Sequence, residues 1–189
     1  MLARIDGGAS AAFSVSGTID GSPASGSASI VDAPPVITTL GGARVAESVE
    51  TVTTTTNGVA TTDTVEVFTN PTTGAEVTET RADGSTVSYP PYTDPPEVVP
   101  GDGGVLADGT IMTGNTPTGT QELSYEVGDD TSDAVVVTIE KKDRDNHGQQ
   151  VRDEKRMYKV DKNGQSSLVS RSVDGEDDGH ADELNEDAD

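Results

Sequence analysis

The feature that most constrains the fold of this chain is a series of short segments in which polar and apolar residues alternate. Such alternation is typical of β-strands with one buried face. Between residues 44 and 89 the segments are RVAESVETVTTTT, VATTDTVEVFT, AEVTETRA and STVSY. Turn signals separate them at Asn57-Gly58, at residues 70–74 and at Asp83-Gly84. No segment keeps helical spacing over three turns, so we predict an all-β chain.

A second series of strand-like segments occupies residues 104–173. Its members are GVLADGTIMTG, QELSYEV, DAVVVTIEKK, QQVRDEKRMYKV and QSSLVSRSV. Shifting the chain by 90 residues places Gly58 over Gly148 and Phe68 over Tyr158, as an internal repeat would. We therefore expect two small antiparallel β-meander or sandwich modules. Either they are duplicated copies, or the match arises by chance.

Three further segments surround these modules. Residues 1–40, rich in Ser, Gly and Ala, predict an extended N-terminal arm. Residues 90–103 hold five of the ten prolines and predict a linker of polyproline type. Residues 174–189 hold nine carboxylates and predict an acidic C-terminal tail. The expected order is an arm (1–40), a Thr-rich β module (41–89), a linker (90–103), a second β module (104–173) and a tail (174–189).

Composition narrows the classes of protein to which the chain can belong. Only 31% of the residues are hydrophobic and 3% aromatic. We therefore expect thin modules, or a subunit whose apolar surface is partly buried against neighbouring subunits, rather than one large core. A net charge of −22 excludes a general nucleic-acid binder. No run approaches the roughly 18 apolar residues of a membrane span, and the N-terminal residues lack the apolar core of a signal peptide.

The sequence offers little for catalysis. There is no cysteine, so thiol chemistry is excluded. The two histidines, His147 and His180, lie near no nucleophile motif. Phosphate-loop, dinucleotide-binding, G-x-S-x-G and zinc-protease motifs do not occur. We predict that the protein is not an enzyme.

Residues 143–154, DRDNHGQQVRDE, match the spacing of a calcium loop. Asp143, Asp145 and Glu154 fall at ligand positions 1, 3 and 12, and Gly148 falls at position 6. They are our candidate ligands for Ca²⁺ or Mg²⁺. His147 at position 5 is a poor ligand for such ions, and the flanking segments indicate strands rather than helices. The alternative is a β-hairpin tip without metal, which the 90-residue repeat favours because Gly58 is kept while the ligands are not.

The same region carries the only basic patch of an acidic chain. All five lysines lie between residues 141 and 162, and residues 140–171 have nine basic and six acidic groups. One interpretation is a solvated hairpin with cross-strand ion pairs. The other is a docking surface for an acidic partner. Its candidate partner-binding residues are Lys141, Lys142, Arg152, Lys155, Arg156 and Lys159.

Scarce lysine with abundant Asp, Thr, Val and Gly is typical of haloarchaeal proteins, whose acidic surfaces keep them soluble in salt. With the arm and the string VEVFTNPTTGAEVTETRADGSTVSY, the chain resembles virion structural proteins of haloarchaeal tailed viruses. The resemblance implies a non-enzymatic virion protein, a capsid decoration or turret subunit that binds the major capsid protein and forms trimers or pentamers. The alternatives are a tail-fibre or receptor-binding component that contacts the host surface, and a cell-surface adhesin or calcium-binding β module.

Overall fold

The computed structural model describes residues 10–19, 22–93, 95, 98–131, 134–161, 166–177 and 181–188. These residues form thirteen β-strands and no helix, which confirms the predicted all-β class. The strands are β1 (Ser10–Ile19), β2 (Ser22–Asp32), β3 (Val36–Leu40), β4 (Ala43–Thr56), β5 (Val59–Thr69), β6 (Glu76–Thr80), β7 (Thr86–Ser88), β8 (Gly103–Thr113), β9 (Thr116–Thr131), β10 (Ala134–Asp145), β11 (Gln150–Asp161), β12 (Ser166–Asp177) and β13 (Ala181–Ala188). None of the described residues belongs to a helix of the length and apolarity that crossing a membrane requires.

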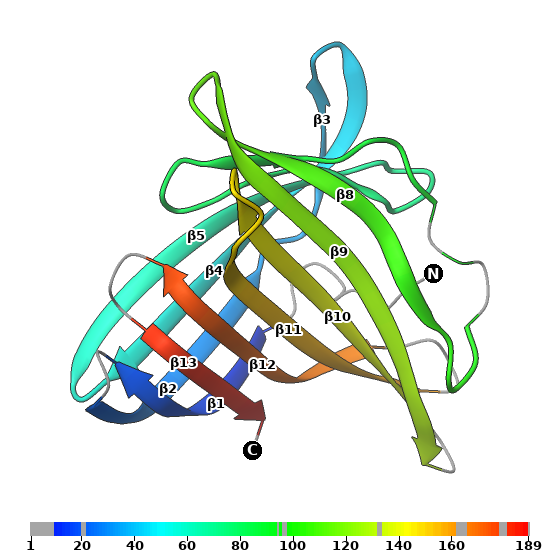
Figure 1. The fold of residues 1–189 in the computed structure, drawn as a ribbon. Helices are drawn as coiled ribbons and strands as arrows, with labels where there is room; N and C mark the ends of the chain where they lie inside the picture. Colours follow the sequence, from blue (N-terminus) through cyan, green and yellow to red (C-terminus); the bar gives the residue numbers. More distant parts are fainter. Residues whose placement is uncertain are drawn as a thin grey trace.

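The strands form one antiparallel sheet that curves into a nearly closed barrel (Figure 1). From β3 onward, each strand pairs with the next along the chain, and β13 pairs with β1. Strands β2 and β3 both pair with the same edge of β4, through Asp32↔Glu50 and Val36↔Glu47. Pro34 and Pro35 separate them, because proline has no N–H for the ladder. Counted as one broken strand, β2 and β3 make this a barrel of twelve strands.

The predicted segments contribute to this single sheet rather than to two separate modules. Strands β7 and β8 flank the Pro-rich segment and pair with each other through Val87↔Ile111. Residues 10–40 of the expected arm supply β1, β2 and β3. The expected tail supplies β13 and the end of β12, while residues 1–9, 178–180 and 189 lie outside the described part. Period-two alternation identifies strands, but it does not say which strand lies beside which.

The proposed duplication is unconfirmed. Gly58 and Gly148 do share a left-handed backbone, with φ of 82° and 79°, as hairpin turns require. However, the 90-residue offset also equates Glu50 with Glu140. Glu50 is buried inside the barrel, whereas Glu140 lies on the outer face, beside Lys142 and Lys155. The two hairpins therefore have similar turns, but equivalent positions on their strands do not face the same side of the sheet.

Apolar side chains fill only part of the barrel interior. One cluster joins strands from opposite walls and consists of Phe13, Val15, Ala28, Ile30, Val52, Val127, Val137, Tyr158 and Leu168. A smaller cluster packs β7, β8 and β9 together and consists of Val87, Tyr89, Ala107, Ile111 and Leu123. Tyr92 packs against the smaller cluster, with its ring edge-on to Tyr89 at a centroid distance of 6.2 Å. Buried charged side chains, with the uncharged Gln121 and Ser85, lie beside these clusters.

Candidate functional site

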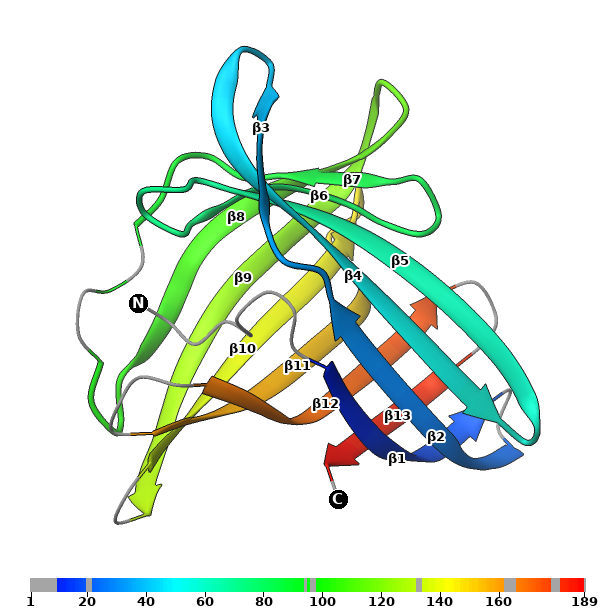
Figure 2. The same cartoon turned by 180° about the vertical axis from the view of Figure 1, so that it is seen from behind.

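The charged side chains of the interior continue the same inward-facing rows that carry the apolar core. On β10, every second residue from Val137 faces inward, so that Lys141 and Asp143 follow Val137 and Ile139 in one row. On β11, Glu154 precedes buried Tyr158 with the same spacing. Each of these strands is therefore apolar at one end and ionic at the end near the β10–β11 turn. Figure 2 shows the two strands side by side in the barrel wall.

The first ionic group connects β10 to β6 across the barrel. The Lys141 ammonium donates to the Glu76 carboxylate at 3.1 Å and also contacts Glu79. Arg81, just after β6, donates from Nε to Glu79 at 2.9 Å. Three strands separate β6 from β10 in the sheet, so these pairs reach across the interior rather than along the wall.

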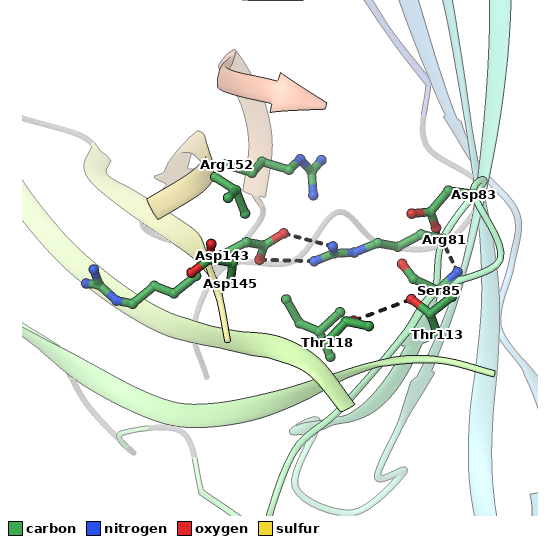
Figure 3. Close-up of a pocket in the computed structure, with 11 residues that line it drawn as sticks. Arg81, Asp83, Ser85, Thr113, Thr118, Asp143, Asp145 and Arg152 are labelled. Carbon is green, nitrogen blue, oxygen red and sulfur yellow. Dashed lines mark hydrogen bonds and ion pairs between the residues drawn. The ribbon is translucent and has the colours of Figure 1, made fainter. Parts of the chain in front are cut away.

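Arg81 also holds Asp143, which is fully buried on β10. The two terminal nitrogens of its guanidinium contact the two carboxylate oxygens at 2.8 and 3.1 Å, a forked arrangement visible in Figure 3. Asp143 accepts a further hydrogen bond from Gln121 Nε2 at 2.7 Å. The Tyr89 hydroxyl donates in turn to Gln121 Oε1. This chain of bonds joins the ionic group to the smaller apolar cluster.

The second ionic group is centred on Glu154. Its carboxylate accepts hydrogen bonds from Arg152 at 2.7 Å, Arg156 at 2.7 Å and Arg171 at 2.9 Å. Arg156 extends further across the barrel, where its Nη2 donates to Glu50 on β4 at 2.7 Å. One buried carboxylate thus gathers three guanidinium groups, and one of these links β11 to the opposite wall.

Among the described side chains, the interior network contains equal numbers of acids and bases. Its acids are Glu50, Glu76, Glu79, Asp143 and Glu154, and its bases are Arg81, Lys141, Arg152, Arg156 and Arg171. The five negative and five positive charges cancel. The remaining residues therefore carry the whole net charge of −22.

The pKa shifts of Glu79, Glu154 and Lys141 keep these three groups charged at neutral pH. Burial alone would raise the pKa of Glu79, but Lys141 and Arg81 outweigh it and lower that pKa to about 2. Burial of Glu154 is likewise outweighed by its arginine partners, and its pKa lies well below the ordinary 4.5. Glu76 and Glu79 overcome the burial of Lys141 and hold its pKa well above the ordinary 10.5.

A small pocket of about 140 Å³ lies at the ionic end of the barrel (Figure 3). It is lined by Arg81, Asp83, Ser85, Ile111, Thr113, Thr118, Asp143, Arg144, Asp145, Val151 and Arg152. The buried Ser85 Oγ has no hydrogen-bond partner there. Ligand pockets are usually about 300–1,000 Å³, so this one has room for a few water molecules. It places no histidine beside Ser85 to act as a base.

The three carboxylates predicted to bind metal do not gather around one point. Asp143 is ion-paired with Arg81 and hydrogen-bonded to Gln121, and Glu154 is ion-paired with three arginines. Asp145 instead stabilises the hairpin turn by accepting the backbone N–H groups of His147 and Gln149 at 2.8 and 2.9 Å. Across the described ranges, no group of three or more acidic or histidine residues is placed to hold a metal ion.

The predicted basic patch is divided between the two faces of the sheet. Lys141, Arg152 and Arg156 face the interior and belong to the network. Lys142, Lys155 and Lys159 lie on the outer face, where Lys142 and Lys155 pair with Glu140. Sequence reasoning missed the partners Glu50, Glu76, Glu79, Arg81 and Arg171. The alternating charges of KKDRD and VRDEKR were the available signal, because residues two apart on a strand share a face.

Comparison with known proteins gives no relative from which a role can be transferred. No protein-family model matches the chain, and neither a curated protein nor a solved structure matches it.

Proposed function

We propose that the protein is a non-enzymatic structural subunit of a virion, namely a capsid decoration or turret subunit that binds the shell and displays its barrel. The observation that carries this proposal is the separation of charge. Five buried acids and five bases of the described residues are paired with one another inside the barrel, while the net charge of −22 lies on the remaining residues.

The interior network supports a role in maintaining shape. Its ion pairs join β6 to β10 and β4 to β11, so they connect walls that the backbone ladder does not connect directly. Glu79, Asp143 and Glu154 each have two or more cationic or amide donors, Glu50 has a bidentate guanidinium, and both oxygens of Glu76 accept from the Lys141 ammonium. Groups held in this way are poor nucleophiles and bases, since any reaction would leave a buried charge without its partner.

The acidic residues outside the interior network support a function at high salt concentration. A large net charge keeps a protein soluble, and salt shortens the Debye length from about 10 Å at 0.1 M to about 3 Å at 1 M. Repulsion between neighbouring subunits then weakens, so copies of an acidic protein can be packed on a shell. Buried pairs are screened much less, and the interior network keeps its strength.

The Thr-rich β4–β5 hairpin favours the tail-fibre alternative. Its two strands pair without a bulge from Ala46↔Thr69 to Thr56↔Val59, and threonines face each other at Thr51↔Thr64. The hydroxyl groups of Thr53 and Thr62 lie 3.2 Å apart across the strands. Such threonine-lined strands, wetted on one face, suit an exposed fibre as well as a shell subunit.

Labelling of particles separates these roles. An antibody raised against this chain would be applied to virus particles and to cells from cultures of the source organism, and located by electron microscopy. A decoration or turret subunit gives regular labelling over the shell. Labelling of the tail alone supports the tail-fibre alternative. Labelling of uninfected cell surfaces without any on particles contradicts both virion roles.

A further inference from the structure

Strand β3 presents an unpaired edge. Its residues pair with β4 from Val36↔Glu47 to Leu40↔Ala43, and within the described ranges no strand pairs with its other side. The β3–β4 hairpin projects beyond the wall of the barrel in both ribbon views (Figures 1 and 2). An edge of this kind carries free N–H and C=O groups that another strand can meet.

This edge is also apolar and uncharged. Four of the nine large apolar side chains that are exposed among the described residues lie within ten positions: Val31, Val36, Ile37 and Leu40. Residues 33–43 contain no charged residue, in a chain whose net charge is −22. Edge strands are commonly protected by lysine or by a bulge, and β3 has neither.

We propose that β3 is a self-association edge, on which β3 of a second copy pairs antiparallel about a two-fold axis. Centred on Thr38, this arrangement places Val36 opposite Leu40 of the second copy and Ile37 opposite Thr39 of the second copy. The edge is thus complementary to itself, as a two-fold interface requires. The inference is independent of the virion proposal, because it follows from the edge alone.

Charge also favours association through an uncharged segment such as β3. Two copies, each with a net charge of −22, repel one another over most of their surfaces. At β3 they meet through a segment that carries no charge, so the repulsion there is weaker than between charged segments. Salt screens the repulsion between the more distant acidic groups, and association therefore strengthens as salt is added.

The proposed contact area is small, so the dimer is expected to be weak. Stable interfaces bury about 1,200–2,000 Å², and one pair of five-residue strands covers much less. The dimer is therefore in exchange with the monomer and depends on protein concentration. Backbone hydrogen bonds supply its specificity, and the apolar side chains on both faces of β3 supply the buried surface.

The test uses the full chain in light scattering coupled to size-exclusion chromatography, at about 0.1 M and about 1 M salt. We expect the apparent mass at high salt to approach twice the 19.4 kDa of one chain. Val36→Lys, at a position that is 64% exposed on the edge, should return the protein to a monomer. Val59→Lys, at a position that is 67% exposed on β5, is the matched control and should leave the dimer unchanged.

The control excludes a trivial explanation, since both substitutions add the same positive charge and thereby reduce the repulsion between copies. A dimer in the wild type and in Val59→Lys, but not in Val36→Lys, supports the proposal. Equal dimerisation of all three proteins overturns it, because another surface is then responsible. A wild type that is monomeric at every salt concentration also overturns it.

Hydrogen exchange supplies the second readout. The β3 amides that do not already donate to β4 should become protected as protein concentration rises at high salt, in parallel with the dimer fraction. Full protection in the monomer would overturn the proposal, because the chain itself would then cover the edge. Protection that requires a different protein would also overturn it, in favour of a heterologous partner. Neither result bears on whether antibody labels virus particles.

Discussion

The two halves of the barrel interior are filled by different kinds of side chain. Toward one end, Phe13, Ile30 and Tyr158 meet across the barrel in an apolar cluster. Toward the β10–β11 turn, guanidinium and carboxylate groups meet instead, as between Arg156 and Glu50. Strands β4, β10, β11 and β12 contribute to both halves, and along them the inward-facing residues change from apolar to charged.

The difference reflects the width of the barrel. About eight strands give an interior that ordinary side chains can fill, and the diameter grows with the number of strands. Twelve strands leave a wider space, and a chain with 31% hydrophobic residues has few large apolar groups to fill it. Arginine, lysine and glutamate are long, and a cation from one wall can meet an anion from the other. Pairing removes most of the cost of burying them.

The strongest test of this comparison removes the centre of the ionic half. Glu154→Gln leaves Arg152, Arg156 and Arg171 without their shared carboxylate, and we expect a loss of about 4 kcal/mol in the free energy of unfolding. Urea unfolding followed by circular dichroism measures it. Glu140→Gln on the outer face is the control, with an expected loss below about 1 kcal/mol. Equal losses would mean that the buried pairs are no more important than surface pairs.

The matching test of the apolar half is Leu168→Ala. Leu168 is buried on β12 and packs in the larger cluster, so a cavity should cost about 3 kcal/mol. Met157→Ala, at an exposed position, should change stability by no more than about 0.5 kcal/mol. If Leu168→Ala proves as mild as Met157→Ala, the apolar half is not the packed core that its burial indicates.

A smaller effect is expected where the two halves join. Tyr89→Phe removes the hydroxyl group that donates to Gln121 and so ends the chain of bonds that leads to Asp143. Gln121 Oε1 would lose a buried partner, at a cost of about 1 kcal/mol. Thermal unfolding of the two proteins measures the difference. An unchanged or increased midpoint would show that the two halves are stabilised independently.

The smallest effect concerns Asp32, at the end of β2 beside the ionic half. Burial and the nearby Glu50 raise its pKa from 3.8 to about 6, against the opposing effect of Arg156. Since the folded state binds this proton more tightly than the unfolded state, the contribution is full below pH 3.8 and is lost as pH rises through about 6. Stability should therefore increase slightly as pH falls from 7 to 5.

Asp32→Asn is the matched variant for this pH test, and its stability should be flat over the same range. At lower pH the dependence of stability on pH has the opposite sign. The pKa of Glu79 is lowered from 4.5 to about 2, so its contribution is present above pH 4.5 and is lost as pH falls through about 2. Both proteins should thus unfold in strong acid. A wild-type profile without a rise between pH 7 and 5 would contradict the placement of Asp32.

Local features of the fold were predictable from the sequence, and distant ones were not. Alternation identified the strands, and Asn57-Gly58 marked a hairpin turn whose asparagine and glycine both have positive φ. Nothing local indicates that β1 lies beside β13, or that Arg156 reaches Glu50, 106 positions away in the chain. Such contacts depend on how many strands the sheet gathers before it closes, which no single segment encodes.

The candidate site was misread for a definite physical reason. Charged residues face solvent in most proteins, so KKDRD and VRDEKR were interpreted as a surface patch or as metal ligands. On a strand, however, Lys141 and Asp143 share one face while Lys142 shares the other. Alternation therefore divides a run of charges between the interior and the exterior. Only the burial of opposite charges from distant strands shows which face is inside.

The pairing of β1 with β13 also bears on how the protein is made. Ribosomes release β1 long before β13, so the edge of β1 stays open until nearly all thirteen strands have been synthesised. Meanwhile Glu50, Glu76 and Glu79 have left the ribosome before the cations on β10 and β11 that neutralise them. Closure therefore has to wait until β13 has been synthesised, and a chain cut short before β13 remains an open sheet that proteases and other open chains can reach.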